Sequence, residues 1–463
     1  MKWDKEKLYL AAPTWLQHAM CSLEGWRINR RRYGSPFHAL LEDYQRRSAW
    51  DATWLCGYRD RRLREFVGFC EETVPYYRRQ FGKLGISSRD IRTLDDLQCL
   101  PVLTKQTVQD RHEEFLSEAI PPRRRVMAHT SGTTGAGLRF AATAEALAEQ
   151  WAVWWRYRLR LGIPFDAWCG YFGGRSIVPL RRGKPPFWRY NLPGRQIFFS
   201  GYHMSPPNLD AYLAQLNKRQ PPWLHGYPSL LALLASHILQ TGQGLGYQVG
   251  WITTGAENLL PQQTKLIERA FGVRPIQHYG MAEAVANISQ CEDGRMRVDE
   301  DFAAVEFLPN SDGPGYKIIG TNFSNRATPL LRYDTGDLAE LPADCAADQH
   351  GGRVAERIDG RREDYVLLKN GARLGRLDHI FKDCLNIRES QIRQDRPGHM
   401  ILHVVRGPDY EQADERQLIA ETAKRVGDEA DFEIVYVDHI PRTKSGKLRF
   451  VVSSIQDQAL KAA

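Results

Sequence analysis

The distribution of hydrophobic and polar positions differs between successive parts of the chain. Residues 1 to about 100 are rich in aromatic residues and arginine and predict a mostly helical segment. Between Thr143 and Leu161, a run rich in Ala, Glu, Trp and Arg predicts another helix, with Thr143 as its N-cap and Gly162 with Pro164 as its stop. The first third of the chain is therefore expected to contain long helices.

The middle of the chain alternates short β-rich runs with helical runs. Trp251 to Thr254 predicts a strand, Pro261 to Phe271 a helix, and Val273 to His278 a second strand. This alternation favours an α/β sheet. From Val305 to Leu341 several strand-like runs follow each other closely, which indicates an added antiparallel or barrel-like unit.

The last hundred residues predict a separate small domain. The polar stretch Ala346 to Gly352 is a candidate connection and Asp359-Gly360 a candidate hinge, which divides the chain into 1–358 and 359–463. The elements predicted beyond the hinge are a hairpin of Tyr365 to Leu368 and Ala372 to Leu374 around the Asn370-Gly371 turn, a helix at Leu377 to Leu385, a strand at His399 to Val405, a helix at Glu411 to Val426 and a strand at Phe432 to Ile440. They make an α+β arrangement.

Composition and charge narrow the classes of function. A chain of 463 residues with 42% hydrophobic residues exceeds what one core usually serves, and 25% charged residues do not indicate disorder. The net charge of +8 suits anionic ligands such as nucleotides, and would also suit nucleic acid or an acidic membrane surface. Two arginine clusters, Arg30 to Arg32 and Arg59 to Arg64, are interpreted as solvated helix faces, because no nucleic-acid-binding motif accompanies them.

Cysteine usage and apolar segments bear on the compartment. The eight cysteines form no CxxC pair, so we expect reduced thiols rather than zinc ligands or disulfides. The N-terminus lacks the apolar stretch of a secretion signal. The longest apolar segment, Leu230 to Leu239, is broken by Ser236 and His237 and falls short of the roughly 20 residues that span a membrane. A cytoplasmic protein without a membrane span is expected.

The most informative motif lies near the end of the chain. Residues Pro441 to Phe450 form a Pro-initiated, Gly-containing turn that carries the cations Arg442, Lys444, Lys447 and Arg449. Because Lys447 follows Gly446 directly, its ammonium can reach a neighbouring site and act as a point charge on a phosphate or carboxylate.

A Gly/Thr-rich loop, His129 to Gly137, is the second motif. Its glycines let backbone N–H groups point at phosphate oxygens, and the hydroxyls of Ser131, Thr133 and Thr134 add donors. It is not a Walker A loop, since Leu138-Arg139 stands where Lys-Ser/Thr is required.

Three further motifs follow in order. In Gln277 to Glu283, which follows a predicted strand, the carboxylate can hold Mg²⁺ and Tyr279 can stack on a base. In Leu331 to Leu338, Asp337 can accept hydrogen bonds from both hydroxyls of a ribose. The third is Gly360 to Tyr365, at the domain boundary. Each alone is compatible with an ordinary turn, but their joint order and spacing are not expected by chance.

This ordered set resembles the adenylate-forming superfamily of acyl-CoA synthetases, luciferases and peptide-synthetase adenylation domains, from about Pro101 to Phe450. Within it the chain looks most like the phenylacetate–CoA ligase branch and its CapK-like members. The stretches that suggest this branch are His225-Gly226-Tyr227-Pro228-Ser229, Gly375-Arg376-Leu377-Asp378 within Asp364 to Ile380, and Arg31-Arg32-Tyr33-Gly34. The resemblance implies an α/β fold with a large multi-subdomain N-terminal adenylation domain and a small mobile α+β C-terminal domain.

In such enzymes a carboxylate attacks the α-phosphate of Mg·ATP, which releases pyrophosphate and leaves an acyl-adenylate. The C-terminal domain then rotates and a thiol, with CoA as the expected acceptor, attacks the acyl carbon. The resemblance assigns the residues of the site by motif. The phosphates would be held by Ser131, Gly132, Thr133, Thr134 and Gly135, and Mg²⁺ by Glu283. Adenine would lie between Tyr279 with Gly280 on one side and Gly255, Ala256 and Glu257 on the other, with Asp337 at the ribose, Arg361 of the hinge motif as a further nucleotide-binding residue, and Lys447 between the carboxylate and the α-phosphate. Lys447 and Glu283 are the expected catalytic residues.

Three positions depart from the superfamily pattern. Ala136 replaces a lysine often found in the phosphate loop, Ala282 stands where Thr or Ser commonly contacts the α-phosphate, and Glu363 occupies the hinge position usually held by Asp or Lys. None of them removes Glu283, Asp337 or Lys447, so an active enzyme is expected.

Other functions remain open at this stage. The activated acyl group, or the adenylyl group, could pass to an amine, a carrier protein, a sugar or a cofactor hydroxyl instead of CoA. From another class, the chain could be a basic nucleic-acid-binding protein or a scaffold with a vestigial nucleotide site. For the acid, Tyr171 to Arg175, His225 to Ser229 and residues between Gly255 and Tyr279 form the expected pocket, whose aromatics suit an aryl or medium-sized apolar acid or simply pack the core. The sequence carries no signal for oligomeric state.

Overall fold

The structure is a computed structural model that describes residues 5–129, 138–259, 261–311, 315–342, 351–359, 365–374, 377–381, 384, 386–407, 410–441 and 451–455. Its first hundred residues are helical, as predicted. The helices before the main sheet are α1 (Lys5–Ala11), α2 (Thr14–Arg32), α3 (Ser35–Arg47), α4 (Ala52–Thr73), α5 (Pro75–Leu84), α6 (Lys105–Asp110) and α7 (Ala144–Arg160). The prediction for α7 is confirmed in detail, since Thr143 Oγ1 accepts a hydrogen bond from the Ala146 N–H at 3.1 Å.

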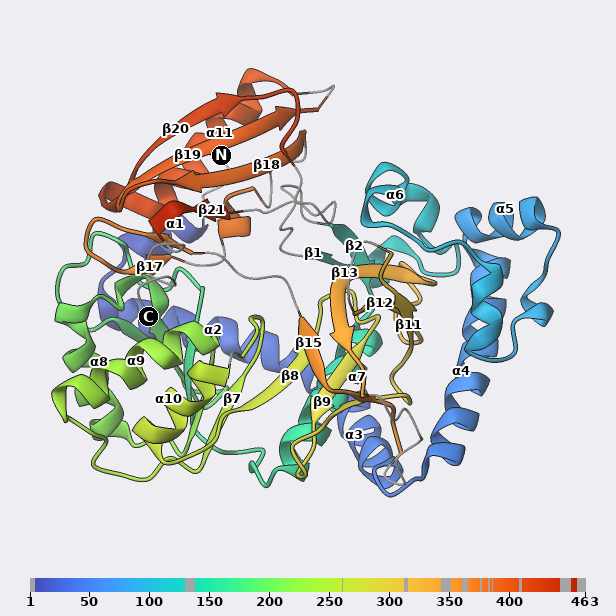
Figure 1. The fold of residues 1–463 in the computed structure, drawn as a ribbon, viewed down its shortest axis with the longest axis horizontal. Coiled ribbons are helices and arrows are strands. Elements are labelled where there is room, and N and C mark those ends of the chain that lie inside the picture. Colours follow the sequence, from blue (N-terminus) through green and yellow to red (C-terminus); the bar gives the residue numbers. More distant parts are fainter. Residues whose placement is uncertain are drawn as a thin grey trace.

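A nine-stranded sheet forms the centre of the large domain (Figure 1). Its strands, in spatial order, are β14 (Val354–Ala355), β10 (Met296–Val298), β9 (Asn287–Gln290), β8 (Ile276–Gly280), β7 (Trp251–Thr254), β6 (Trp223–Gly226), β3 (Cys169–Gly173), β5 (Gln196–Ser200) and β4 (Trp188–Asn191). The middle strands from β5 to β8 are parallel, and the flanking ones are antiparallel. The predicted strand at Trp251–Thr254 has the predicted bounds, while β8 begins three residues later than predicted.

Helices cover both faces of this sheet. One face packs against α8 (Leu209–Arg219), α9 (Pro228–Thr241) and α10 (Pro261–Phe271), whose apolar residues share a core with β3, β5, β6 and β7. The other face packs against α3 and α7. Two buried faces explain why the parallel strands are rich in Trp, Ile and Phe. The predicted α/β class is confirmed, and so is the helix at Pro261–Phe271.

Two smaller sheets complete the large domain. An antiparallel sheet has the order β11 (Ala303–Pro309), β12 (Tyr316–Asn322), β13 (Tyr333–Glu340) and β15 (Arg357–Asp359), which agrees with the antiparallel unit predicted for this region. The short pair β1 (Val126–His129) and β2 (Arg139–Ala142) is also antiparallel, with His129 opposite Arg139.

The C-terminal part is an α+β unit built on a four-stranded sheet. The strands are β20 (Asp431–Tyr436), β19 (His399–Arg406), β18 (Ile387–Gln394) and β21 (Val451–Ser453), and α11 (Gln412–Val426) packs against them. The hairpin around Asn370-Gly371 is confirmed as β16 (Val366–Leu367) and β17 (Arg373–Leu374). The helix predicted at Leu377 to Leu385 is wrong in its first turn, which is a 3-10 turn at Leu377–Ile380.

The C-terminal unit, orange and red in Figure 1, packs on the large domain beside the segment that follows β3. Arg425 Nη1 of α11 lies 3.5 Å from Ser176 Oγ and donates to Tyr202 Oη at 3.3 Å. The Tyr202 ring is buried in the apolar core of the C-terminal unit. The two parts therefore share a contact that includes both polar and apolar groups.

A run of buried acids, Asp299 to Asp301, ties the N-terminal helices to the sheet. Arg156 of α7 contacts Asp299 and Asp301 at 2.7–2.9 Å, Arg47 of α3 contacts Asp301 at 2.7 Å, and Arg59 of α4 contacts Glu300 at 3.0 Å. The interpretation of Arg59 to Arg64 as a solvated face is wrong for Arg59, which is 7% exposed, because its charge is neutralised by an acid 241 positions away. This arginine is occupied inside the protein and is not part of a nucleic-acid patch.

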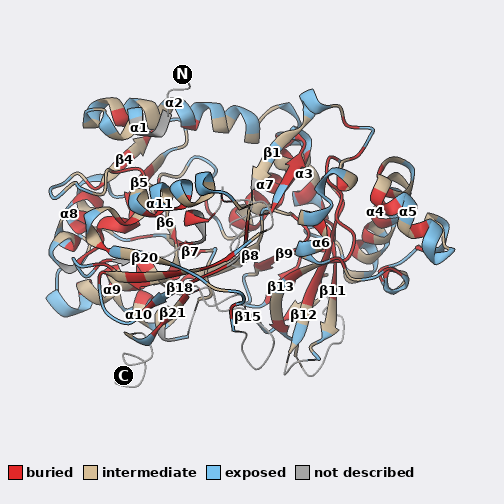
Figure 2. Cartoon of the chain, turned by 90° about the horizontal axis from the view of Figure 1, so that it is seen from above, coloured by how far each residue is buried: buried red, intermediate tan, exposed pale blue. Residues whose placement is uncertain are grey.

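Burial follows these contacts (Figure 2). Buried residues run along the strands of the sheets, whereas the outer surfaces of α4 and α5 are exposed. Among the helices of the described residues, none has the length and apolar character required to cross a membrane.

Candidate active site

Three of the predicted motifs meet at the ends of neighbouring strands. Gly255 to Glu257 follow the C-terminal end of β7, and Tyr279 and Gly280 end the adjacent parallel strand β8. Asp337 lies in β13 of the antiparallel sheet. Tyr279 Oη donates a hydrogen bond to Asp337 Oδ2 at 2.9 Å. A hydrogen bond thus links the residue predicted to lie against adenine to the residue predicted to bind the ribose hydroxyls.

Glu283 lies in the turn after β8, close to the same group. Its Oε1 is 3.5 Å from Tyr333 Oη, and its main-chain carbonyl accepts a hydrogen bond from Asn322 Nδ2 at 3.2 Å. The carboxylate is partly exposed. Among the described residues no group of three or more His, Cys, Asp or Glu side chains could hold a metal ion. A single accessible carboxylate fits Mg²⁺ bound mainly by nucleotide phosphates rather than by a protein cage.

Backbone strain is concentrated in these motifs. Of the five non-glycine residues with positive φ in the described chain, three lie here: Ala256 at 68°, Ala284 at 57° and Arg332 at 52°. Each such residue costs on the order of 1–3 kcal/mol and persists only where its surroundings impose it. The positive φ of Arg332 is held in place by a bidentate ion pair between its guanidinium and the Glu306 carboxylate, at 2.8–2.9 Å. The turn that leads into β13, the strand of Asp337, is therefore held in a defined conformation.

Glu257, which is predicted to border adenine, also contacts the first turn of α9. Its carboxylate accepts hydrogen bonds from the Ser229 N–H at 3.1 Å and from Ser229 Oγ at 3.0 Å, in the first turn of α9. An acid at the N-terminus of a helix is favourable. This contact fixes the Gly255 to Glu257 turn against the segment His225 to Ser229.

The remaining predicted site residues lie outside the described part of the chain. They are Ser131, Gly132, Thr133, Thr134, Gly135, Arg361 and Lys447. The departures Ala136 and Glu363 lie outside it as well.

A cavity of about 490 Å³ adjoins the strand ends. Gly255, Ala256 and Gly280 line it on the nucleotide side, and Tyr171, Arg175, His225 and Tyr227 from the predicted acid pocket line it too. Sequence reasoning missed the wall formed by α7 and α2. That wall contains Trp151, Trp154, Trp155 and Arg158 of α7 and Arg32 of α2. The i, i+3, i+4, i+7 spacing of the four α7 residues places them on one helix face, which is the signal that could have found them.

Two histidines of the cavity wall are neutral. Burial lowers the pKa of His225 and of His278 to about 3, and the positive charge of Arg158 contributes in both cases. His278 Nε2–H donates to Asn287 Oδ1 at 2.8 Å, which also accepts from Trp154 Nε1 at 2.9 Å. His225 Nδ1 lies 2.8 Å from Thr253 Oγ1. The two imidazole rings therefore provide fixed hydrogen-bonding groups in the cavity wall and carry no charge.

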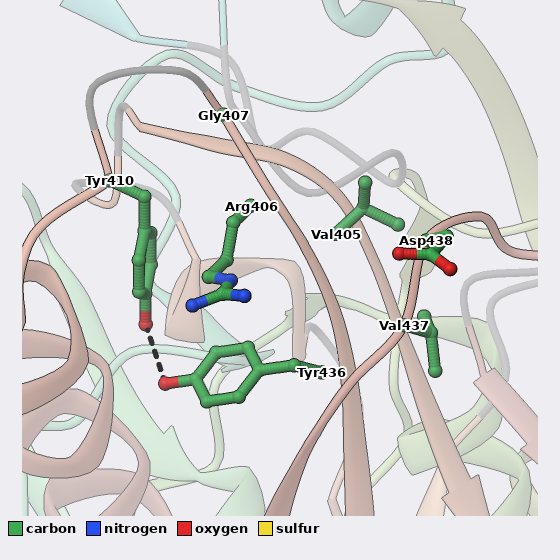
Figure 3. Close-up of a pocket in the computed structure, with 7 residues that line it drawn as sticks. All are labelled: Val405, Arg406, Gly407, Tyr410, Tyr436, Val437 and Asp438. Atoms are coloured by element: carbon green, nitrogen blue, oxygen red, sulfur yellow. Dashed lines mark hydrogen bonds between the residues drawn. The ribbon is translucent and has the colours of Figure 1, made fainter.

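A second recess lies on the C-terminal unit (Figure 3). It is lined by Arg406, Tyr410, Tyr436 and Asp438, among others. The two tyrosine hydroxyls are 3.1 Å apart, and the Arg406 guanidinium lies 4.9 Å from the centre of the Tyr436 ring. None of the candidate residues described above lines it.

Comparison with known proteins agrees with this geometry. The family described as the CapK C-terminal domain matches residues 368–454. Protein CapK of Staphylococcus aureus is 26% identical, over 97% of this chain and 99% of its own length. Phenylacetate-coenzyme A ligase of Escherichia coli is 25% identical, over 66% of this chain and 71% of its own length. A crystal structure of 2-hydroxyisobutyryl-CoA ligase, with 18% identity, covers 90% of this chain and 94% of its own with a TM-score of 0.58.

The fold, with a large α/β domain followed by a small C-terminal one, is that of adenylate-forming ligases. In sequence, the chain is similar to CapK and to the phenylacetate–CoA ligases.

Proposed function

We propose that this protein is an AMP-forming acid–CoA ligase. It activates a carboxylic acid as an acyl-adenylate, with release of pyrophosphate, and then transfers the acyl group to the thiol of CoA. The observation that carries the proposal is the 2.9 Å hydrogen bond between Tyr279 and Asp337, because it unites two motifs 58 residues apart beside a cavity large enough for a small acid. The relatives named phenylacetate–CoA ligase support the same chemistry.

The proposed first step is displacement at phosphorus. A carboxylate oxygen of the acid bonds to the α-phosphorus of ATP, and the bond to the β-phosphate bridging oxygen breaks as pyrophosphate leaves. Asp337 would accept hydrogen bonds from the ribose hydroxyls, and Tyr279 would lie against adenine. Lys447 would stabilise the negative charge that builds between carboxylate and α-phosphate. Glu283 would hold Mg²⁺, which, when bound, neutralises phosphate charge.

In the second step the sulfur of CoA bonds to the acyl carbon and AMP leaves. The solved structure with CoA and an acyl-adenylate belongs to a ligase of the same fold, which supports this acceptor. An amine, carrier protein, sugar or cofactor hydroxyl is less favoured, because four of the relatives are named phenylacetate–CoA ligase.

We also propose that the two domains meet at 358/359 and that the C-terminal domain is mobile. A cytoplasmic location is the proposed compartment, supported by the free thiols of the described cysteines.

The test is acid-dependent exchange of labelled pyrophosphate into ATP, run over a panel of carboxylic acids without CoA. The proposal predicts exchange with at least one acid and none when the acid is omitted. Addition of CoA should then yield equal amounts of AMP and thioester. Absence of exchange for every acid, in a protein shown to be folded, would contradict the proposal.

A further inference from the structure

The cavity beside the nucleotide motifs contains an arginine of unusual environment. Arg158 of α7 is 8% exposed, and its guanidinium lies 5.1–5.7 Å from the ring centres of Trp151, Trp155 and Trp223. Its Nε has no hydrogen-bond partner, and no carboxylate of the described chain pairs with it. The polar groups near it in the described chain include the Tyr157 hydroxyl and the neutral rings of His225 and His278.

The other buried arginines of the described chain all have hydrogen-bonded partners, which include a carboxylate in every case except Arg189. Those partners are Asp301 for Arg47 and Arg156, Glu300 for Arg59, Asp293 for Arg297, Glu306 for Arg332, and Gln17 with two main-chain carbonyls for Arg189. A buried charge without a counter-ion is costly, so proteins pair such groups unless a ligand completes the site. Arg156 and Arg158 differ by two positions on one helix, yet only Arg156 has carboxylate partners.

Two more cations share the cavity with Arg158. The Arg32 guanidinium stacks on Trp151 at 3.9 Å from the ring centre, and Arg175 lies over Tyr171 and Phe198 at 5.7 and 5.0 Å. Neither pairs with a carboxylate of the described residues. Burial lowers the pKa of Arg32 to about 10, and repulsion from Arg175 and Arg158 adds to the effect, so these cations lie close together.

The carboxylate on this wall does not neutralise them. Asp166 lines the cavity but pairs with Arg195 at 3.1 Å. The wall therefore carries an excess of positive charge, together with tryptophan rings that suit an apolar or aromatic skeleton. A purely apolar acid, which the aromatic residues alone would suit, would leave Arg158 uncompensated.

We propose that the activated acid carries a second oxyanion, a carboxylate or a phosphate, at the end remote from its reacting carboxylate. This group binds between Arg158 and Arg32, and the tryptophans cover the carbon skeleton, while the reacting carboxylate lies toward Gly255 and Gly280. Arginine suits this role because its planar fork binds oxyanions through two parallel hydrogen bonds. The inference rests on the proposed function for the identity of the bound molecule as a substrate.

The test compares acids matched in skeleton. Hexanoate is compared with adipate, and phenylacetate with 4-carboxyphenylacetate and 4-(phosphonooxy)phenylacetate, by kcat/KM in pyrophosphate exchange without CoA. The anion-tailed acids should be preferred. Arg158→Gln and Arg32→Gln should each lower that preference by roughly 10- to 100-fold, the range for loss of one charge-assisted contact. Arg158→Lys should restore part of it, because it keeps the charge and loses the fork.

The matched control is Arg219→Gln. Arg219 also stacks on an aromatic ring, Tyr190 at 4.9 Å, but it is exposed and does not line the cavity. Its substitution should leave the preference unchanged. Because Arg32 is only partly buried, Arg32→Gln provides the test should Arg158→Gln fail to fold.

Calorimetric binding of adipate and 4-carboxyphenylacetate, with a non-hydrolysable ATP analogue present, separates the two proposals. Arginine-dependent binding without exchange would support the oxyanion site and contradict the ligase. Equal use of neutral and anion-tailed acids, with a ratio unchanged in both variants, would overturn the oxyanion site and leave the ligase intact. An arginine effect seen only after CoA is added would also overturn it, since the oxyanion would then belong to CoA.

Discussion

The hydrogen bond between Tyr279 and Asp337 gives a prediction whose size follows from its geometry. Tyr279→Phe keeps the ring that would lie against adenine and removes one hydroxyl, which donates to a carboxylate at 2.9 Å. Hydrogen bonds to charged groups contribute about 1.5–3 kcal/mol, and partial exposure of both groups favours the lower end. We expect the KM for ATP to rise roughly 10-fold. Asp337→Asn should raise it by roughly 10- to 100-fold, because the contacts to the ribose weaken as well.

The assay is pyrophosphate exchange with ATP, 2′-deoxy-ATP and 3′-deoxy-ATP. Because the Tyr279 hydroxyl acts through the carboxylate, the double variant should be no more than about threefold worse than Asp337→Asn. The wild type should discriminate against both deoxy analogues, and Asp337→Asn should lose most of that discrimination. Fully additive effects, or discrimination that Asp337→Asn leaves intact, would refute the assignment.

Three other outcomes are expected. Glu283→Gln should lower exchange by roughly 10²-fold and raise the Mg²⁺ concentration required, since a metal contributes several kcal/mol of charge stabilisation; an unchanged Mg²⁺ dependence would count against Glu283. Arg156→Met should lower the urea-derived free energy of unfolding by about 3 kcal/mol, because it leaves two buried carboxylates short of a partner. A loss below about 1 kcal/mol would show that this ion-pair network does not stabilise the fold. Burial raises the pKa of Asp301, but Arg156 and Arg47 outweigh it and hold that pKa below its usual value. The ionised Asp301 carboxylate thus stabilises the fold above about pH 4, and this stabilisation is lost as the pH falls through the lowered pKa of Asp301 in the folded protein. The melting temperature should therefore drop on acidification, and the drop should be smaller in Arg156→Met.

Elements with a strong local signal were predictable from the sequence. The helix capped by Thr143, the strand at Trp251–Thr254 and the hairpin around Asn370-Gly371 each depend on residues within a few positions. Strand β18 was not predicted, because it buries polar Ser390 and Gln394 on the same strand as Ile392 and so lacks an apolar run.

Contacts between distant residues were not predictable in the same way. The burial of Arg59 depends on Glu300, which no local pattern connects to it. The candidate nucleotide site was partly predictable, because Tyr279 and Asp337 each lie in a recognisable motif, although their contact becomes visible only in the folded chain. The arginine and tryptophan wall was not predicted. The spacing from Trp151 to Arg158 places the four side chains on one helix face, but it does not tell whether that face borders a cavity or packs in the core.

The lysine near the C-terminus provides the most direct test of the central claim, that this chain forms an acyl-adenylate. The measurement is acid-dependent pyrophosphate exchange by Lys447→Ala, beside Lys444→Ala as a control from the same turn. We expect a loss of roughly 10²-fold or more for Lys447→Ala, the size typical of one contact to a developing charge, and near-normal exchange for Lys444→Ala. Exchange that persists undiminished in Lys447→Ala would contradict it.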